Sequence, residues 1–257
     1  LCCGLILLIC ITSSKVLYKF GVPLLLIFIF LGMIFGIIGI DFSDFQLTGE
    51  IASIALVFIM FYGGFGTNWS MARPKAVPSI LMSTLGTIIT FFITGLFVYL
   101  IFKISLLESL LIGAVVSSTD AASVFTILRS QKLNLEGSLA SLLEVESGSN
   151  DPVAYMLTLI ILTIMGNGTV MQLIPMIVSQ IVFGIIVGAV IAIASIYLIR
   201  HANFEIESFY IIFIIAIAII SYSLSEWMGG NGYLSVYISG IIIGNSNWIT
   251  ARCMILS

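Results

Sequence analysis

One short stretch of the sequence carries most of the side chains that could do chemistry. Residues 144–152 read Glu-Val-Glu-Ser-Gly-Ser-Asn-Asp-Pro, and the apolar run that follows carries no charge. If the stretch is helical, Ser147 and Asp151 share one face, while Glu146 and Asn150 share the adjacent stripe. Ionisable groups inside an apolar span are costly and by default mark a functional site. Carboxylate, hydroxyl and amide oxygens together suit a hard cation.

Pro152 predicts a further oxygen ligand in the same place. Proline has no N–H, so in a helix the carbonyl of Gly148, four residues earlier, loses its usual partner. The alternative is a surface loop between two helices, capped by Ser and Asp side chains. Residues Arg129–Ser141 already provide a polar connection, and a second loop so soon afterwards would leave almost no helix between them. We therefore place the cluster within a helix over Leu142–Met165.

A second polar group interrupts the apolar segment Leu106–Leu128. Residues 117–123 read Ser-Ser-Thr-Asp-Ala-Ala-Ser, and the small residues alone are typical of close helix packing. Asp120, however, needs a partner, a cavity or a helix N-terminus at this depth. A helix break at Ser118–Thr119 would provide that N-terminus and would expose carbonyl ligands, as in the broken helices of transporters. We expect Asp120 to support the helix end rather than hold the ion.

Composition restricts the class of protein. The chain is 60% hydrophobic and only 8% charged, whereas a soluble domain needs far more charge on its surface. The sequence therefore predicts an all-α polytopic membrane protein, and without a basic patch we expect no nucleic-acid partner. Cys2, Cys3, Cys10 and Cys253 lack metal-ligand spacing with His201, the single histidine, so we expect neither a zinc site nor an organic cofactor.

The apolar segments predict about nine spans. The first, Leu1–Ile11, is too short to cross a membrane alone. The others are Gly21–Ile40, Ile51–Gly66, Val77–Phe102, Leu106–Leu128, Leu142–Met165, Leu173–Ile199, Phe204–Leu224 and Tyr233–Trp248. The sequence begins at a leucine and stops just after an apolar segment. We therefore expect residues 1–257 to be one transmembrane domain truncated at both ends.

The connections between spans differ in charge. Of the nine basic residues, only Lys103 falls on one side, and the others fall on alternate connections that we assign to the cytoplasm. The glycine-rich helix end Tyr62–Gly66 indicates close packing, and Gly229–Gly232 indicates a turn. Glu226, at the end of a span, is expected to be a solvated loop charge.

Two motifs give the chain a family resemblance. Residues 117–125, Ser-Ser-Thr-Asp-Ala-Ala-Ser-Val-Phe, precede residues 143–152, Leu-Glu-Val-Glu-Ser-Gly-Ser-Asn-Asp-Pro. In this order they resemble the monovalent cation/proton antiporters of the sodium–hydrogen exchanger superfamily, closest to the bacterial potassium/proton type. Gly-Val-Pro at 21–23, the glycines at 63–64 and Gly-Asn-Gly-Tyr-Leu at 230–234 are supporting matches, so the resemblance covers nearly the whole chain.

The resemblance implies a fold of about thirteen helices in two inverted repeats, with a discontinuous helix. The chain would then be a fragment of that fold, within a homodimer in the bacterial plasma membrane. A core domain carrying the ion would move against a dimerisation domain. The implied activity is exchange of K⁺ or Na⁺ for H⁺, without enzymatic chemistry.

The resemblance also implies roles for individual residues. Asp151 would bind cation and proton in turn, with Ser147 and Thr119 as further cation ligands. Thr119 and Asp120 would lie in an unwound crossing. The other implied ligands or orienting residues are Glu146 and Asn150. An Asn-Asp pair at this place resembles the electroneutral branch, because the electrogenic branch has two aspartates.

Two departures from the family pattern concern the completeness of the site. Many relatives carry an acidic residue where this chain has Tyr62. The chain also ends before the helices that would hold a second crossing and its basic residue, so we expect this chain alone not to form the whole ion site.

Two other functions fit parts of the pattern. A cation channel would need a continuous pore rather than one occluded site. An intramembrane aspartyl protease would use Asp120 and Asp151, but that family has Tyr-Asp and Gly-x-Gly-Asp motifs, whereas Thr119 and Asn150 precede the aspartates here. We favour an exchanger in which a cation and a proton exclude one another from Asp151.

Overall fold

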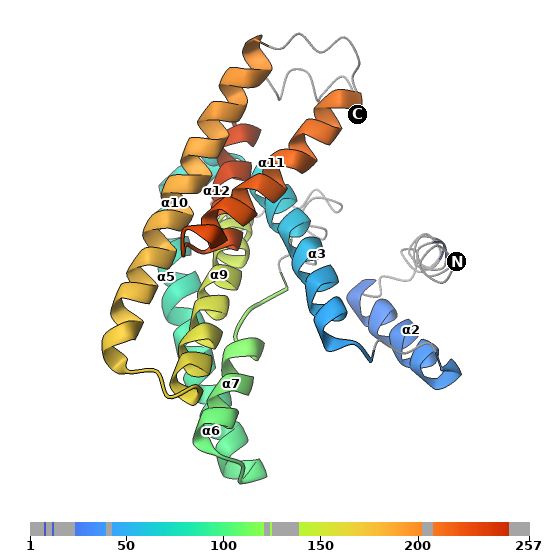
Figure 1. Ribbon diagram of the computed structural model, residues 1–257, viewed down its shortest axis with the longest axis vertical. Helices are drawn as coiled ribbons and strands as arrows, with labels where there is room; N and C mark the ends of the chain where they lie inside the picture. Colours follow the sequence, from blue (N-terminus) through green and yellow to red (C-terminus); the bar gives the residue numbers. More distant parts are fainter. Residues whose placement is uncertain are drawn as a thin grey trace. The chain divides into compact units, whose positions relative to one another are not determined.

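The chain folds into helices. The computed structural model (Figure 1) describes Leu8, Thr12 and residues 24–39, 43–120, 124, 139–201 and 208–246. Every regular element in these ranges is helical, which confirms the predicted all-α class. Five helical stretches among them are long and apolar enough to cross a membrane: Phe45–Gly66, Trp69–Phe102, Leu139–Met165, Met171–His201 and Phe209–Trp227. Three predicted spans correspond to shorter apolar helices, and the predicted Leu1–Ile11 segment lies almost wholly outside the described residues.

Residues 1–53 and 54–257 form two compact units. In the first unit, α2 (Leu24–Ile38) ends at Gly39, whose φ of +89° is a conformation that favours glycine. The helix α3 (Phe45–Gly66) begins in the first unit and continues into the second. The Asp44 carboxylate accepts hydrogen bonds from the N–H groups of Gln46 (3.0 Å) and Leu47 (3.1 Å). This cap explains why α3 starts earlier than the predicted Ile51.

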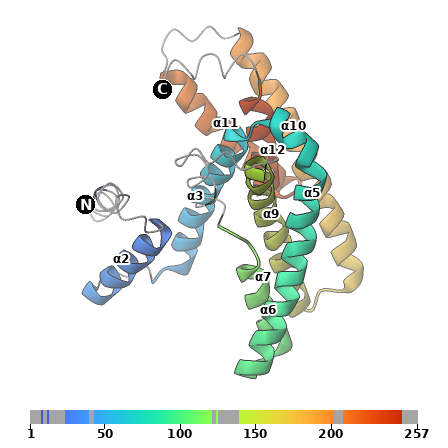
Figure 2. The ribbon, with the colours of Figure 1, turned by 180° about the vertical axis from the view of Figure 1, so that it is seen from behind.

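The second unit contains the remaining helices. A nearly continuous helical stretch runs through α4, a 3₁₀ turn, α5, a π-helical segment and α6 before the chain turns into α7. The bounds are α4 Trp69–Ala72, η2 Arg73–Lys75, α5 Ala76–Leu81, η3 Met82–Gly86, α6 Thr87–Phe102, α7 Leu106–Val116, α9 Leu139–Met165, α10 Val170–His201, α11 Ser208–Trp227 and α12 Gly232–Gly244. Seen from behind, α5 and α6 run beside α9 (Figure 2).

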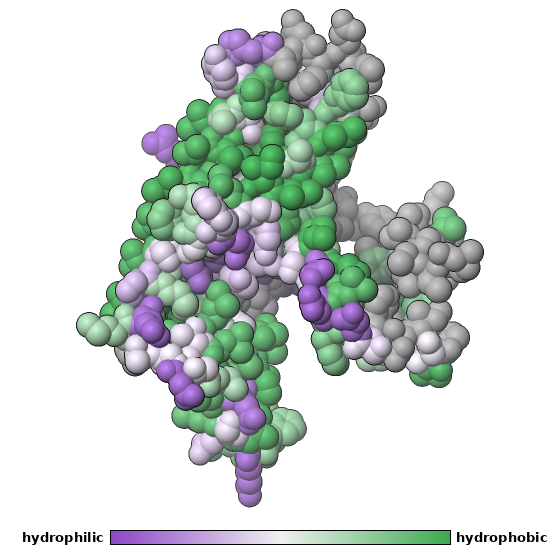
Figure 3. Space-filling view, viewed as in Figure 1, coloured by the Kyte–Doolittle hydropathy of each residue, from purple (hydrophilic) through white to green (hydrophobic). Residues whose placement is uncertain are grey.

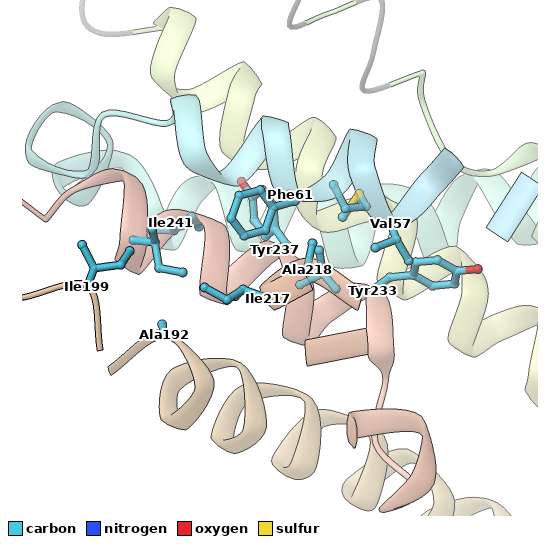
Figure 4. Close-up of a cluster of buried hydrophobic side chains, with 12 residues drawn as sticks. Val57, Phe61, Ala192, Ile199, Ile217, Ala218, Tyr233, Tyr237 and Ile241 are labelled. Carbon is cyan, nitrogen blue, oxygen red and sulfur yellow. The ribbon is translucent and has the colours of Figure 1, made fainter. Parts of the chain in front are cut away.

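The core of the second unit lies around α12. Its buried side chains pack against those of α3, α10 and α11 (Figure 4). The buried members of this cluster are Val57, Met60, Phe61, Ala192, Ile199, Ile217, Ala218, Tyr233, Val236, Tyr237, Ile241 and Ile243. A smaller cluster of Phe91, Ala114 and Ile161 joins α6, α7 and α9. Much of the remaining surface is apolar (Figure 3), as expected for helices that face lipid.

Glycines let α3 and α12 approach to backbone contact. A Cβ added to Gly64 would lie 2.4 Å from the Tyr237 carbonyl oxygen, and one added to Gly240 would lie 2.7 Å from the Phe61 carbonyl oxygen. No side chain fits in either place. The close packing predicted for the glycine-rich end of this helix is therefore confirmed.

Candidate ion-binding site

The acidic motif lies inside one long helix. α9 runs without interruption from Leu139 to Met165 with Pro152 in its interior, so the surface-loop alternative is wrong. Ser147 is fully buried and Asn150 is 1% exposed. The Ser79 hydroxyl of α5 donates to the Leu142 carbonyl at 3.2 Å, which fixes the first turn of α9 against the core. The helix therefore carries its polar residues inward, as its spacing predicts.

The second polar motif follows a helix end. α7 starts with a capping box between Ser105 and Glu108 and stops at Val116. The residues from Ser117 to Asp120 are not helical, and the N–H of Val124, which is helical again, donates to the Asp120 carbonyl at 3.1 Å. The predicted break at Ser118–Thr119 is confirmed, whereas the end of the predicted span at Leu128 lies outside the described residues.

The break and α9 are joined through Asp151 and Asn150. The Ser118 hydroxyl donates a hydrogen bond to the Asp151 carboxylate, and its oxygen also lies 3.3 Å from the Asn150 side-chain oxygen. The Asn150 amide in turn donates to the Thr119 hydroxyl. Two elements separated by a long stretch of sequence therefore meet at these four side chains.

Two further contacts extend this network along α9. The Thr119 and Ser147 hydroxyl oxygens lie 3.3 Å apart. The Glu146 carboxylate lies at 3.5 Å from the Asn150 amide nitrogen, one helical turn away. The structure thus brings together Asp151, Asn150, Ser147 and Thr119, with Glu146 at the edge of the group.

A cavity of about 400 Å³ opens beside this network. Its polar wall comes from the broken segment and from one face of α9, and its apolar wall comes from α3, α7 and α9. The lining residues are Leu56, Ile59, Val115, Ser118, Thr119, Asp120, Asp151, Ala154, Tyr155 and Thr158. This volume is large enough for a cation with several waters, since a water occupies about 30 Å³ in the liquid.

The predicted site residues divide into two groups around this cavity. Asp151, Thr119 and Asp120 line it, whereas the half-buried Glu146 and the buried Ser147 and Asn150 do not. A cation in the cavity would therefore meet carboxylate and hydroxyl oxygens first, and the Asn150 amide would hold the Thr119 hydroxyl in place.

Sequence reasoning missed several groups at the site. Ser118 was expected to lie at the helix break but not to bond Asp151. Thr158, which lines the cavity, follows Asp151 by two helical turns. Because this spacing puts Thr158 on the same face of the helix as Asp151, the sequence could have indicated Thr158 as a site residue. Glu226 was expected to be a solvated loop charge, and this is wrong. It lies within α11, half buried, and its carboxylate accepts the Gly232 N–H at 2.8 Å, because the first N–H groups of a helix lack helical partners.

The fold and the site together define a class of protein. Long apolar helices, a broken helix and a cavity at the break with carboxylate and hydroxyl groups in its wall are features of secondary transporters. The sequence model of the family described as "Sodium/hydrogen exchanger, transmembrane" matches residues 4–251. The chain belongs to this family, which is a family of transporters rather than enzymes.

Individual relatives agree with this assignment. The chain is 36% identical over 248 residues to the K(+)/H(+) antiporter NhaP of Alkalimonas amylolytica, covering 95% of this chain and 43% of that protein. It is 33% identical over 250 residues to the K(+)/H(+) antiporter NhaP2 of Shewanella oneidensis, covering 94% of this chain and 43% of the relative. The chain therefore spans less than half the length of these curated relatives.

A solved structure supports the fold. The sodium proton antiporter MjNhaP1 from Methanocaldococcus jannaschii at pH 8 superimposes with a TM-score of 0.79 and 22% identity. The match covers 97% of this chain and 62% of that one. This extent of match agrees with the expected fragment of a larger antiporter fold.

Proposed function

We propose that the full-length protein containing this chain exchanges a monovalent cation, K⁺ or Na⁺, for H⁺ across the cell membrane. The observation that carries the proposal is the Asp151 carboxylate, which lines the cavity and accepts the Ser118 hydroxyl hydrogen bond. The names of the relatives, which are K(+)/H(+) and Na(+)/H(+) antiporters, support the same activity. The relatives give no support to a channel or an intramembrane protease.

The exchange rests on competition for one carboxylate. Asp151 is neutralised either by a proton or by a cation, and the two exclude one another from the same oxygens. Thr119 would add a neutral ligand from the broken segment, and Ser147 of α9, whose hydroxyl oxygen lies 3.3 Å from that of Thr119, would add a further one from behind the cavity wall. If the site crosses the membrane only when Asp151 is neutralised, every outward proton requires an inward cation, or the reverse.

The neighbouring residues would shape the site. Asn150 bonds the Thr119 hydroxyl and carries no charge, so it adds no second proton-binding group beside Asp151. This supports electroneutral exchange. Glu146 and Asp120 would contribute negative field around the cation, with Asp120 supporting the end of the broken helix. The ions are the only ligands that the proposed exchange requires, and we propose a homodimer in the cell membrane as the working assembly.

The test is exchange by the full-length protein in proteoliposomes. Dissipation of a pH gradient on adding K⁺ or Na⁺ is followed with the membrane potential clamped. Asp151→Asn should reduce exchange to the background of empty vesicles while leaving the amount of folded protein unchanged. Asp44→Asn, a matched carboxylate-to-amide change at the exposed cap of α3, should exchange at the wild-type rate. Exchange by Asp151→Asn at the wild-type rate would show that the proposed function is wrong.

A further inference from the structure

The turn between α11 and α12 is a buried junction of several helices. Asn231, at its centre, has an exposed fraction of 0%. Its backbone N–H donates to the Gln180 carbonyl of α10 at 3.0 Å. Its side-chain oxygen accepts the Leu234 N–H at 3.0 Å and so caps α12, while its side-chain nitrogen donates to the Pro152 carbonyl of α9 at 3.2 Å. One side chain thus joins the start of α12 to the residue after Asp151.

A second contact joins α12 to α9 on the other side of Asp151. A Cβ added to Gly148 would lie 2.6 Å from a ring carbon of Tyr237, and Tyr237 is itself 2% exposed. α12 therefore holds α9 at positions 148 and 152, which flank Asp151. Pro152 removes the hydrogen bond that would normally close this turn of α9, so contacts from outside the helix set its local geometry.

The surroundings of Asn231 leave it little freedom to shift. A Cβ added to Gly230 would lie 2.7 Å from Phe183 Cβ, and one added to Gly184 would lie 3.0 Å from the Asn231 carbonyl oxygen. Gly229 has a φ of +77°, which a residue with a side chain rarely adopts. The turn is therefore fitted closely to α10, and Asn231 presents its amide to α9 from a fixed support.

We propose that Asn231 is a positioning residue for the ion site. Its amide fixes the Pro152 carbonyl and thereby the direction in which Asp151 enters the cavity. The proposal rests on the proposed function, because it requires that the cation binds at Asp151. The turn at Gly229–Gly232 would then affect cation affinity, although it does not line the cavity.

If Asn231 served only to cap α12, a different result would be expected from its substitutions. Aspartate and serine cap helices about as well as asparagine does, and aspartate at a helix N-terminus also interacts favourably with the helix dipole. Neither residue reproduces the contact with α9. An aspartate directs an oxygen at the Pro152 carbonyl, and a serine side chain is too short to reach it. Asn231→Asp and Asn231→Ser therefore keep the cap and lose the bond to Pro152.

Asn68→Asp is the matched control. Asn68 caps α4 by accepting the Met71 N–H at 3.4 Å and the Ser70 hydroxyl at 2.7 Å, and it is not among the residues that line the cavity. The same change of amide to carboxylate is made there at an N-cap away from the ion site. It reports what the substitution does to folding and exchange when no bond to Pro152 is involved.

The experiment measures exchange by the full-length protein in proteoliposomes as a function of K⁺ and Na⁺ concentration. The folded amount of each variant is determined by size-exclusion chromatography. Asn231→Asp and Asn231→Ser should each raise the half-saturating cation concentration about five- to tenfold, with a smaller change in maximum rate. Asn68→Asp should leave both quantities unchanged. If Asn231 only capped α12, these variants would not raise the half-saturating cation concentration more than they change the maximum rate.

Two results would overturn the inference. One is half-saturation unchanged in both Asn231 variants while Asp151→Asn abolishes exchange, which would leave the proposed function standing. The other is loss of folded protein in both Asn231 variants, which would reduce Asn231 to a structural residue. Wild-type exchange by Asp151→Asn would instead overturn the proposed function itself.

Discussion

The Ser118 hydroxyl donates a hydrogen bond to the Asp151 carboxylate, although the two residues are 33 positions apart in the sequence. Ser118 lies just after the end of α7, and Asp151 directly precedes the proline inside α9. The contact therefore joins the two places where regular helical hydrogen bonding is interrupted. At such a place some backbone groups already lack a helical hydrogen-bond partner. They can therefore bind an ion together with side-chain oxygens, and no hydrogen bond of an intact helix has to be broken.

Replacement of Ser118 should weaken cation binding. Ser118→Ala removes the hydroxyl donor from Asp151, and a hydrogen bond to a charged group is worth roughly 1.5–3 kcal/mol. At a fixed pH we expect the half-saturating cation concentration to rise about tenfold, with folding unchanged, as measured by exchange in proteoliposomes. Ser117→Ala is the control, because the Ser117 hydroxyl donates to the Ala114 carbonyl at 2.7 Å instead. Equal half-saturation in the two variants would contradict this role of Ser118.

The contact between α3 and α12 should not tolerate an added methyl group. In Gly64→Ala the new Cβ would lie 2.4 Å from the Tyr237 carbonyl oxygen and 3.1 Å from the Ile241 nitrogen, both backbone atoms. We expect a loss of about 1–3 kcal/mol of stability, seen as a lower Tm in detergent. Gly86→Ala, where no atom of another described segment lies within 4 Å of the added Cβ, should leave Tm nearly unchanged. Equal Tm values for the two variants would contradict the close approach.

The direction of the helices can be tested by labelling. In a variant without native cysteines, a membrane-impermeant maleimide should reach cysteine at Lys75 or Arg200 only from the cytoplasm. It should reach cysteine at Lys103 or Asn167 only from outside. The α6–α7 and α9–α10 connections lie toward one end of the second unit and the end of α10 toward the other (Figure 1), in agreement with this assignment. Labelling of all four positions from one side would contradict the predicted spans.

Local chemistry made part of the site predictable. The spacing of Ser147, Asn150 and Asp151 placed them on two neighbouring stripes of one helix, and the polar connection at Arg129–Ser141 favoured a helix over a second loop. The run of small polar residues around Thr119 indicated the break because a carboxylate at that depth requires a helix end or a cavity. Both inferences depend only on residues that are close together in the sequence, within a few turns of one helix.

Contacts between distant segments were not predictable. The bond from Asn231 to Pro152 spans 79 positions, and the composition of its turn shows only that the chain changes direction. Glu226 was misjudged for the same reason: its partner, the Gly232 N–H, becomes available only because α12 starts immediately after the turn. A single sequence contains propensities and periodicities, but not which helices will lie side by side.

The central place of α12 has a consequence for synthesis. The carbonyl of Pro152 emerges from the ribosome 79 residues before Asn231, which is its partner. At roughly 5–20 residues per second, this interval lasts about 4–16 s. During this time α9 must enter the bilayer with the surface around Gly148 and Pro152 still uncovered by α12. Lipid, water or the insertion machinery has to cover this surface first, and the arrival of α12 then covers the turn of α9 that carries Asp151.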